Sequence, residues 1–274
     1  MEKKEKINIL VIGIGVLLIF LTGLFVVLKP FIGKKNNTLL ESNTDPEYIN
    51  DLKKAKKITS EDLRKKILIG KNTLVIDIRD EISFAEEHIV DSINIPYPNI
   101  QNSLASLDKT KTYVLVDDGS SFQAAALAGG IFTTNDFLNV FYLSGGFIAW
   151  KNKTNLTITA GNPTSFIDQS KVLYVSSDDL KKIIETENDF YIIDVREKGQ
   201  FESGHIKNAT NIFLDDLEKR RAEIPRGKKI ILCDDNSFMA FQAGVRLADL
   251  GFSNVTVLSD GLNVWKEKSY EIVK

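Results

Sequence analysis

Short apolar runs alternate with longer amphipathic segments along most of the chain. The runs are rich in β-branched residues, as buried parallel strands are, and they occur in pairs over residues 75–78 and 192–195, 112–116 and 229–233, and 140–143 and 255–258. Amphipathic segments begin with helix-start signals at residues 60–63 and 177–180, each a serine followed by early acids and a leucine. Strands that alternate with helices predict an α/β fold in which helices cover both faces of a mostly parallel sheet.

This alternation of apolar runs and amphipathic segments occurs twice along the chain. Residues 74–80 (LVIDIRD) match residues 191–197 (YIIDVRE) at an offset of 117. Other residues matched at this offset are Phe84 with Phe201, His88 with His205, Asn94 with Asn211, and Asp117-Asp118 with Asp234-Asp235. Near the ends of the copies, Gly146 and Trp150 match Gly261 and Trp265 at an offset of 115, so the second copy has lost two residues in between. A repeat of this length indicates a duplicated domain.

The longest apolar segment precedes the repeat, over residues 7–28, and carries no charge. As a helix it would extend about 33 Å, enough to cross a hydrocarbon core of roughly 30 Å. A buried core helix would show a polar face, and a cleaved signal peptide would have a shorter apolar region followed by small residues. We therefore expect a single membrane-spanning helix over residues 7–28, with the lipid bilayer as its partner.

Lysines flank this segment on both sides, three before it and three after it, so the positive-inside rule gives a weak signal. Because most of the chain follows the segment, we expect a cytoplasmic N-terminus and domains outside the cytoplasm. The expected organisation is an anchor over residues 1–33, a hydrophilic stalk over 34–56, a first domain over 57–153, a polar linker over 154–172 and a second domain over 173–274.

Composition narrows the possible functions. The chain has 43% hydrophobic and 26% charged residues and a formal net charge of -2, which fits a folded protein and favours no nucleic-acid partner. Cys233 is the only cysteine, so an intrachain disulfide and a cysteine-rich metal site are both excluded. With only two histidines, His88 and His205, we expect no metal and no cofactor.

The second copy reads Asp194-Val195-Arg196-Glu197, then Phe201, Gly204-His205-Ile206 and Asn211, and it ends with Gly251-Phe252, Gly261 and Trp265. This set resembles the opening and closing motifs of the rhodanese family. The first copy matches less well, with Glu87 where the motif has glycine, but it keeps Gly145-Gly146 and Trp150. The resemblance covers residues 57–274 and implies tandem rhodanese-like domains.

In rhodaneses, a cysteine after the second apolar strand opens a loop that leads into a helix. Amide groups of that loop lower the thiol pKa, and the thiolate takes sulfane sulfur from a donor and holds it as a persulfide. Counting from Leu247 and Asp260 places this cysteine position at Asp234, and the repeat places it at Asp117 in the first copy. The resemblance therefore implies that both nucleophile positions hold aspartate.

The two candidate binding loops follow from this count. The first reads Asp117, Asp118, Gly119, Ser120, Ser121, Phe122, and the second reads Asp234, Asp235, Asn236, Ser237, Phe238, Met239. The basic residue usual at the far end of the loop is replaced by Phe122 or Met239. The acidic loops would repel thiosulfate or phosphate. A cation held by Asp117-Asp118 with Ser120 is the less favoured interpretation, because adjacent acids at a helix start commonly act as caps.

Other motif residues have structural interpretations. We expect His88 and His205 to cap backbone groups at a bend, and Asp77 with Arg79, like Asp194 with Arg196, to form local ion pairs. Cys233 lies one residue before the nucleophile position, so the alternation of strand side chains turns it away from the loop. A buried structural role for Cys233 is the favoured interpretation.

Three functions remain open. The leading one is a membrane-tethered, catalytically inactive protein, a pseudoenzyme that binds an unknown protein or small-molecule partner through the two loops. The alternative is a divergent thiosulfate-type sulfurtransferase that uses Cys233 as the persulfide-forming nucleophile. In the third, one domain is a rigid spacer and only the other binds. The direction of the Cys233 side chain discriminates between the enzyme and the binding module.

Overall fold

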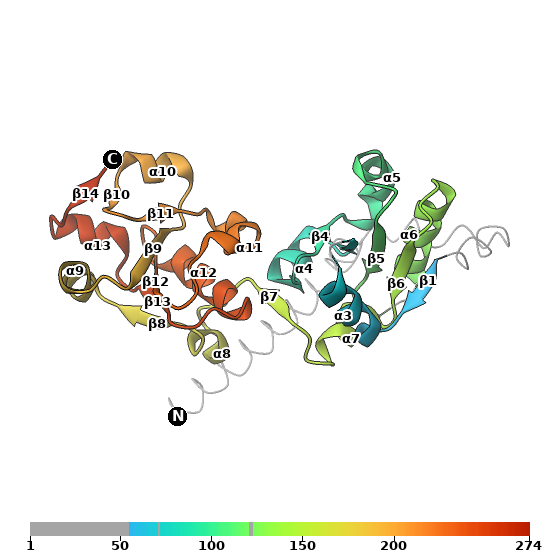
Figure 1. Ribbon diagram of the computed structural model, residues 1–274, viewed down its shortest axis with the longest axis horizontal. Coiled ribbons are helices and arrows are strands. Elements are labelled where there is room, and N and C mark those ends of the chain that lie inside the picture. The colour runs from blue at the N-terminus through green and yellow to red at the C-terminus, as the bar shows by residue number, and fades with distance from the viewer. Residues whose placement is uncertain (1–54, 71, 121–122) are drawn as a thin grey trace, which may run out of the picture. The chain divides into compact units, whose positions relative to one another are not determined.

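The computed structural model describes residues 55–70, 72–120 and 123–274 (Figure 1). The predicted anchor over residues 7–28 and nearly all of the predicted stalk lie outside these residues. Within the described ranges, no helix combines the length and the apolar character needed to cross a membrane.

Each copy of the repeat forms a five-stranded sheet in which all neighbouring strands are parallel. The first sheet has the order β1-β6-β5-β2-β4, and its strands are β1 (Lys56–Ile58), β2 (Thr73–Asp77), β4 (Ile93–Asn94), β5 (Thr112–Val116) and β6 (Val140–Leu143). The second sheet has the order β8-β13-β12-β9-β11, with β8 (Leu173–Val175), β9 (Phe190–Asp194), β11 (Thr210–Asn211), β12 (Lys229–Cys233) and β13 (Val255–Leu258). Corresponding strands occupy corresponding places, so the predicted α/β fold of two duplicated parallel-sheet domains is confirmed.

Helices lie on both faces of each sheet (Figure 1). In the first domain they are α3 (Ser60–Ile69), α4 (Glu81–Glu86), α5 (Ile100–Ser103), α6 (Gln123–Thr134) and α7 (Gly146–Lys151), with 3-10 turns η1 (Tyr97–Asn99) and η2 (Leu104–Ser106). In the second domain they are α9 (Ser177–Thr186), α10 (Lys198–Ser203), α11 (Leu217–Arg220), α12 (Phe238–Asp249) and α13 (Gly261–Glu267), with η3 (Leu214–Asp216) and η4 (Arg221–Glu223). Helix α8 (Phe166–Gln169) lies between the domains in sequence.

Helices α3 and α9 are capped one residue before the serines that the sequence predicted as their caps. The Thr59 hydroxyl accepts a hydrogen bond from the Asp62 amide in α3, and the Ser176 hydroxyl accepts one from the Asp179 amide in α9. Such caps satisfy amides that have no partner inside the helix. The serines expected as caps, Ser60 and Ser177, are instead the first helical residues.

Strand alternation divides each core into two layers. In β12, Ile230 and Leu232 face the cluster beneath α12, whereas Ile231 and Cys233 face the cluster beneath α9 and α13. The first domain has the same arrangement, with Leu115 facing α6 while Val114 and Val116 face α3 and α7. Each sheet is therefore buried on both faces, which explains the continuous apolar runs.

The segment expected as a polar linker over residues 154–172 contains a strand that belongs to the first domain. Strand β7 (Thr157–Thr159) pairs antiparallel with β3 (Glu87–Ile89), and Ile158 is buried. The second domain ends in the same way, with β14 (Ile272–Val273) paired to β10 (His205–Ile206). The pairing with β3 therefore continues the contacts of the first domain to residue 159, six residues beyond the expected boundary at residue 153.

The two residues missing from the second copy lie between the central strand and the next helix. In the first domain residues 117–122 separate β5 from α6, whereas in the second only residues 234–237 separate β12 from α12. Phe238 and Met239, expected in the second loop, are the first residues of α12. We call residues 117–122 the first loop and residues 234–237 the second loop.

Candidate functional site

Both loops begin at the carboxyl end of the central strand of their sheet, where parallel α/β folds commonly bind ligands. Each loop touches the start of the helix that follows the neighbouring strand. The Phe147 amide donates to the Asp117 carbonyl at 2.8 Å, and the Leu262 amide donates to the Asp234 carbonyl at 2.8 Å. A Cβ on Gly261, which has φ +70°, would lie 2.4 Å from the Asp235 carbonyl oxygen, so this approach requires glycine.

Asp117 and Asp234 occupy the predicted nucleophile positions and are almost fully buried. One Asp117 oxygen accepts from the Gly119 amide at 3.0 Å, and the other accepts from the Ala125 amide at 3.3 Å. Asp234 Oδ2 accepts from the Met239 amide at 3.1 Å, whereas its buried Oδ1 has no hydrogen-bond partner among the described residues. Burial raises the pKa of both carboxyls, although nearby backbone amides oppose this rise.

The second loop borders a cavity of about 280 Å3. It is lined by Arg196, Gln200, Asp234, Asp235, Asn236, Phe238 and Met239. Among the lining residues, Asp235 accepts from Arg196 Nη1 at 3.0 Å and from Gln200 Nε2 at 3.3 Å. The cavity is therefore lined by two carboxylates, and its one guanidinium, that of Arg196, is shared between Asp235 and Asp194.

In the first loop, the Asp118 carboxylate accepts hydrogen bonds from within the loop itself. Asp118 accepts from the Ser120 amide and hydroxyl, both at 2.8 Å, so this pair forms a local turn. Gly119 has φ +91°, and a Cβ there would lie 2.1 Å from the Gly145 carbonyl oxygen. Ser121 and Phe122, also expected in this loop, lie outside the described residues.

The remaining second-loop residues shape the start of α12. Asn236 Oδ1 accepts from the Phe238 amide at 3.2 Å, and Ser237 adopts a left-handed backbone with φ +72°. Phe238 is 51% exposed, whereas Met239 packs against the core under α12. An exposed phenyl ring at the cavity rim offers apolar surface to a ligand.

Cys233 lies on the opposite side of its strand from the second loop. Its side chain is fully buried among Leu180, Ile206 and Trp265, and its sulfur lies 3.6 Å from the Ile193 carbonyl oxygen. Burial, followed by the charge of Asp194, raises the pKa of this thiol well above its ordinary value. A buried neutral thiol directed into the sheet–helix core is a poor nucleophile.

The two Asp-x-Arg motifs form ion pairs that brace the strand ends. In the second domain, Arg196 Nη2 lies 2.6 Å from Asp194 Oδ2 and 2.9 Å from the Gly204 carbonyl oxygen, and both side chains are buried. Burial opposes the charge of Arg196, but the Asp194 carboxylate outweighs it and raises the pKa of the guanidinium. In the first domain, Arg79 pairs with Asp77 at 2.6 Å and its guanidinium stacks on the Phe147 ring at 3.9 Å.

The two histidines cap carbonyl groups. His88 Nδ1 lies 2.9 Å from the Phe84 carbonyl oxygen and His205 Nδ1 lies 3.0 Å from that of Phe201, with each ring stacked on the phenylalanine concerned. His88 Nε2 additionally lies 3.1 Å from Glu218 of the second domain. Neither histidine lines the second-loop cavity, so neither is placed to act as a base there.

Sequence reasoning did not include Gln200 and Lys266 in the site. Gln200 lines the cavity from α10, and Lys266 Nζ lies 3.9 Å from Asp235. The sequence held one signal for Lys266, because this residue directly follows the motif residue Trp265. Gln200 gave no comparable signal, because it carries no charge and its copy in the first domain is Ser83.

Comparison with known proteins agrees with this geometry. The sequence profile described as Rhodanese-like domain matches residues 59–153 and again residues 176–268. The chain is 38% identical over 77 residues to the uncharacterized protein YqhL of Bacillus subtilis, a match that spans 28% of this chain and 61% of that protein. It is 34% identical over 91 residues to the human centrosomal protein of 41 kDa, covering 29% of this chain and 24% of the relative.

Solved structures give similar matches. Thiosulfate sulfurtransferase from Pseudomonas aeruginosa aligns with 80% of this chain and 43% of its own, at 18% identity and a TM-score of 0.43. A rhodanese-related protein from Thermoplasma volcanium aligns with 37% of this chain and 97% of its own, at 26% identity and a TM-score of 0.34.

Proposed function

Because the chain belongs to the rhodanese-like domain family, we propose that it is a non-catalytic member that binds a protein or small-molecule partner through its two loops. The observation that carries this proposal is the placement of sulfur. The only cysteine of the chain is buried in the sheet–helix core, and both loop positions from which a thiolate could act hold aspartate. Neither carboxylate can accept a sulfur atom as a persulfide.

The second loop is the better supported binding site. Its cavity is lined by Asp234 and Asp235, and the exposed ring of Phe238 stands at its edge. A partner group that donates a hydrogen bond, such as an amide or an ammonium, suits the acidic lining of this cavity, whereas an anion does not. This chemistry differs from that of a site for thiosulfate.

We also propose that residues 7–28 tether the two domains to a membrane, with the N-terminus in the cytoplasm and the domains outside it. The uncharged sequence of this segment supports the tether. Tethering would confine the binding loops to partners at or near that membrane.

A cyanide–thiosulfate assay on the full-length protein tests the proposal. We expect the wild type to show no sulfur transfer above background. Asp234→Cys should form a detectable persulfide, because its sulfur lies at the start of the second loop beside the Met239 amide. The gain should be small, because the neighbouring Asp235 keeps the pKa of a new thiol high. Asp234→Ser is the matched control without sulfur.

The variant Cys233→Ser tests the alternative function, a sulfurtransferase that uses Cys233 as its nucleophile. Under the proposal this substitution changes no sulfur transfer, because the wild type has none to lose. Robust wild-type turnover that disappears in Cys233→Ser, with the fold intact by circular dichroism, would overturn the proposal and establish Cys233 as the nucleophile.

A further inference from the structure

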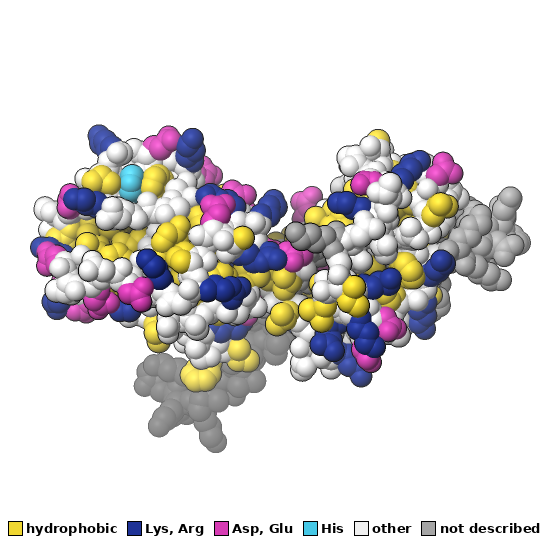
Figure 2. All heavy atoms as spheres, viewed as in Figure 1, with side chains coloured by type: hydrophobic (Ala, Val, Ile, Leu, Met, Phe, Trp, Pro, Cys, Tyr) yellow, Lys and Arg dark blue, Asp and Glu magenta, His cyan; other side chains and the backbone are white. Residues whose placement is uncertain are grey.

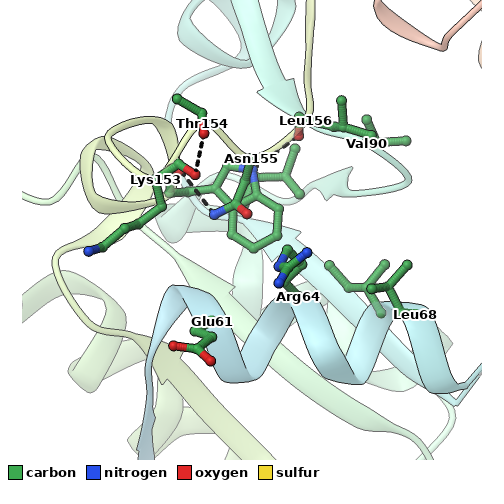
Figure 3. A pocket seen from close by; sticks show the side chains of 11 residues that line it. Glu61, Arg64, Leu68, Val90, Lys153, Thr154, Asn155 and Leu156 are labelled. Carbon is green, nitrogen blue, oxygen red and sulfur yellow. Dashed lines mark hydrogen bonds between the residues drawn. The ribbon is translucent and has the colours of Figure 1, made fainter.

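The two copies also differ away from the loops, at a groove of the first domain (Figure 3). The groove has a volume of about 540 Å3, within the range typical of ligand sites. Figure 3 shows Arg64 and Leu68 of α3 on one side and Asn155 and Leu156, from the segment after α7, on the other. Trp150 also lines it, with its indole nitrogen donating to the Leu156 carbonyl at 3.0 Å.

The second domain fills the corresponding place with its own side chain. Tyr270 occupies the position of Asn155, at the offset of 115 that also relates Trp150 to Trp265. Its ring meets the Trp265 ring edge-on, with the centroids 5.0 Å apart. Trp265 donates to the Glu271 carbonyl as Trp150 does to that of Leu156, so the backbone follows the same path in both copies.

The groups that hold Tyr270 have counterparts around the groove. The Tyr270 hydroxyl donates to Asp178 at 2.6 Å, and Lys181 lies over the ring at 4.7 Å. At the offset of 117, Asp178 corresponds to Glu61 and Lys181 to Arg64, which both line the groove. The first domain thus keeps the indole, the acceptor and the cation of a tyrosine site but lacks the tyrosine.

The rim of the groove is apolar where the second domain is charged. Leu68, 74% exposed, replaces Glu185, and Leu156, 68% exposed, replaces Glu271. Val90 replaces Lys207, which lies 3.4 Å from Glu271 in the second domain. Apolar side chains in this part of the domain lie among Lys and Arg side chains over α3 and α7 (Figure 2). An apolar rim wider than one ring suits a polypeptide with apolar residues beside its tyrosine.

We propose that this groove binds a tyrosine side chain, flanked by apolar residues, from a partner protein. The ring would meet Trp150 edge-on as Tyr270 meets Trp265, beneath Arg64, and its hydroxyl would donate to Glu61. The site is separate from both loops and does not depend on what they bind.

A tyrosine of this chain, Tyr48, lies outside the described residues and is the competing occupant. Ala55, the first described residue, packs against Gly129 of α6, whereas the groove belongs to the side of the sheet that α3 and α7 cover. We therefore commit to an occupant from another molecule and make occupation by Tyr48 an outcome of the test.

Nuclear magnetic resonance of the full-length protein tests the proposal through its two indole signals, one from each domain. The probes are acetyl-Leu-Tyr-Leu-amide and the same peptide with alanine in place of tyrosine. We expect the tyrosine peptide to shift the Trp150 signal saturably and to bind at least about tenfold more tightly than the alanine peptide. The Trp265 signal should not move.

Two variants sharpen the test. Asn155→Tyr supplies the missing ring from within the chain and should abolish the shift of Trp150. Tyr270→Asn opens the matching place in the second domain, where the charged Glu185 and Glu271 should keep peptide binding weaker than at the first. A wild type that shows no saturable shift, or a shift that persists in Asn155→Tyr, would overturn the proposal. Binding that appears only in Tyr48→Ser would overturn it too, by identifying Tyr48 as the occupant.

Discussion

Replacing Arg196 with methionine should destabilise the second domain more than any change at its surface. The guanidinium donates to both oxygens of Asp194, to the Gly204 carbonyl and to Asp235, and its side chain is 3% exposed. Asp194 itself is fully buried. Removing one partner of a buried ion pair leaves the other charge uncompensated, at a cost of about 3–5 kcal/mol. We therefore expect Arg196→Met to lower the free energy of unfolding of this domain by about that amount.

The assay must separate the two domains. Because each domain contains one tryptophan, urea unfolding of a 5-fluorotryptophan-labelled chain gives one fluorine signal for each of them. Only the Trp265 signal should move to lower urea in Arg196→Met. The matched variant Arg79→Met should move only the Trp150 signal, because Arg79 pairs with Asp77 in the first domain.

A double variant checks the cause of the loss. Asp194→Asn combined with Arg196→Met removes the uncompensated charge, so it should be more stable than Arg196→Met alone. A loss below about 1 kcal/mol in Arg196→Met, or a double variant no more stable than the single one, would show that the ion pair does not brace the strand end.

Three further outcomes follow from the structure. Asp234→Asn should stabilise the chain relative to wild type more at pH 7 than at about pH 3. The folded-state pKa of Asp234 is raised by burial, so the wild type loses stability as the pH rises through that pKa. Urea titrations at both pH values measure the difference in stability between variant and wild type, and a difference that does not change with pH would contradict the prediction. Cys233→Ser should cost about 1–3 kcal/mol, because it places a hydroxyl in the apolar cluster around Trp265, and a native chain should leave Cys233 unreacted with a thiol reagent until it unfolds. Deleting residues 1–33 should release a soluble, monodisperse and folded protein from the membrane fraction, and aggregation of that fragment would show that residues 7–28 belong to a core.

Much of this fold can be predicted from the sequence because its strands are buried on both faces. Continuous apolar runs predicted the three central strands of each sheet, and the 117-residue repeat predicted that the two sheets share one strand order, whichever it was. The alternation of side chains along a strand also gave the direction of Cys233, since Ile231 and Cys233 share one face and Leu232 faces the other.

Other features depend on tertiary contacts. The short segment Thr157–Thr159 carries one apolar residue, and only its pairing with β3 makes it a strand. The change of offset showed that two residues were lost somewhere between Asp235 and Ser259, but the sequence could not place the loss at the start of α12. The cavity at the second loop depends on the distance between Arg196 and Asp235, which are far apart in the sequence.

The duplication separates what the fold requires from what can diverge. Both copies keep the Asp-x-Arg pair and the histidine stacked on phenylalanine, and in each case the side chains satisfy backbone groups of their own domain. The loops and the groove differ instead. The second domain shortens its loop and joins Asp235 to Arg196, but closes its groove with Tyr270. The first domain keeps Asp118 within its own loop and leaves its groove open beside Trp150. Each domain therefore has a surface feature that the other lacks, as expected if the two domains bind different partners. The interpretation in which one domain is only a spacer is less favoured for this reason.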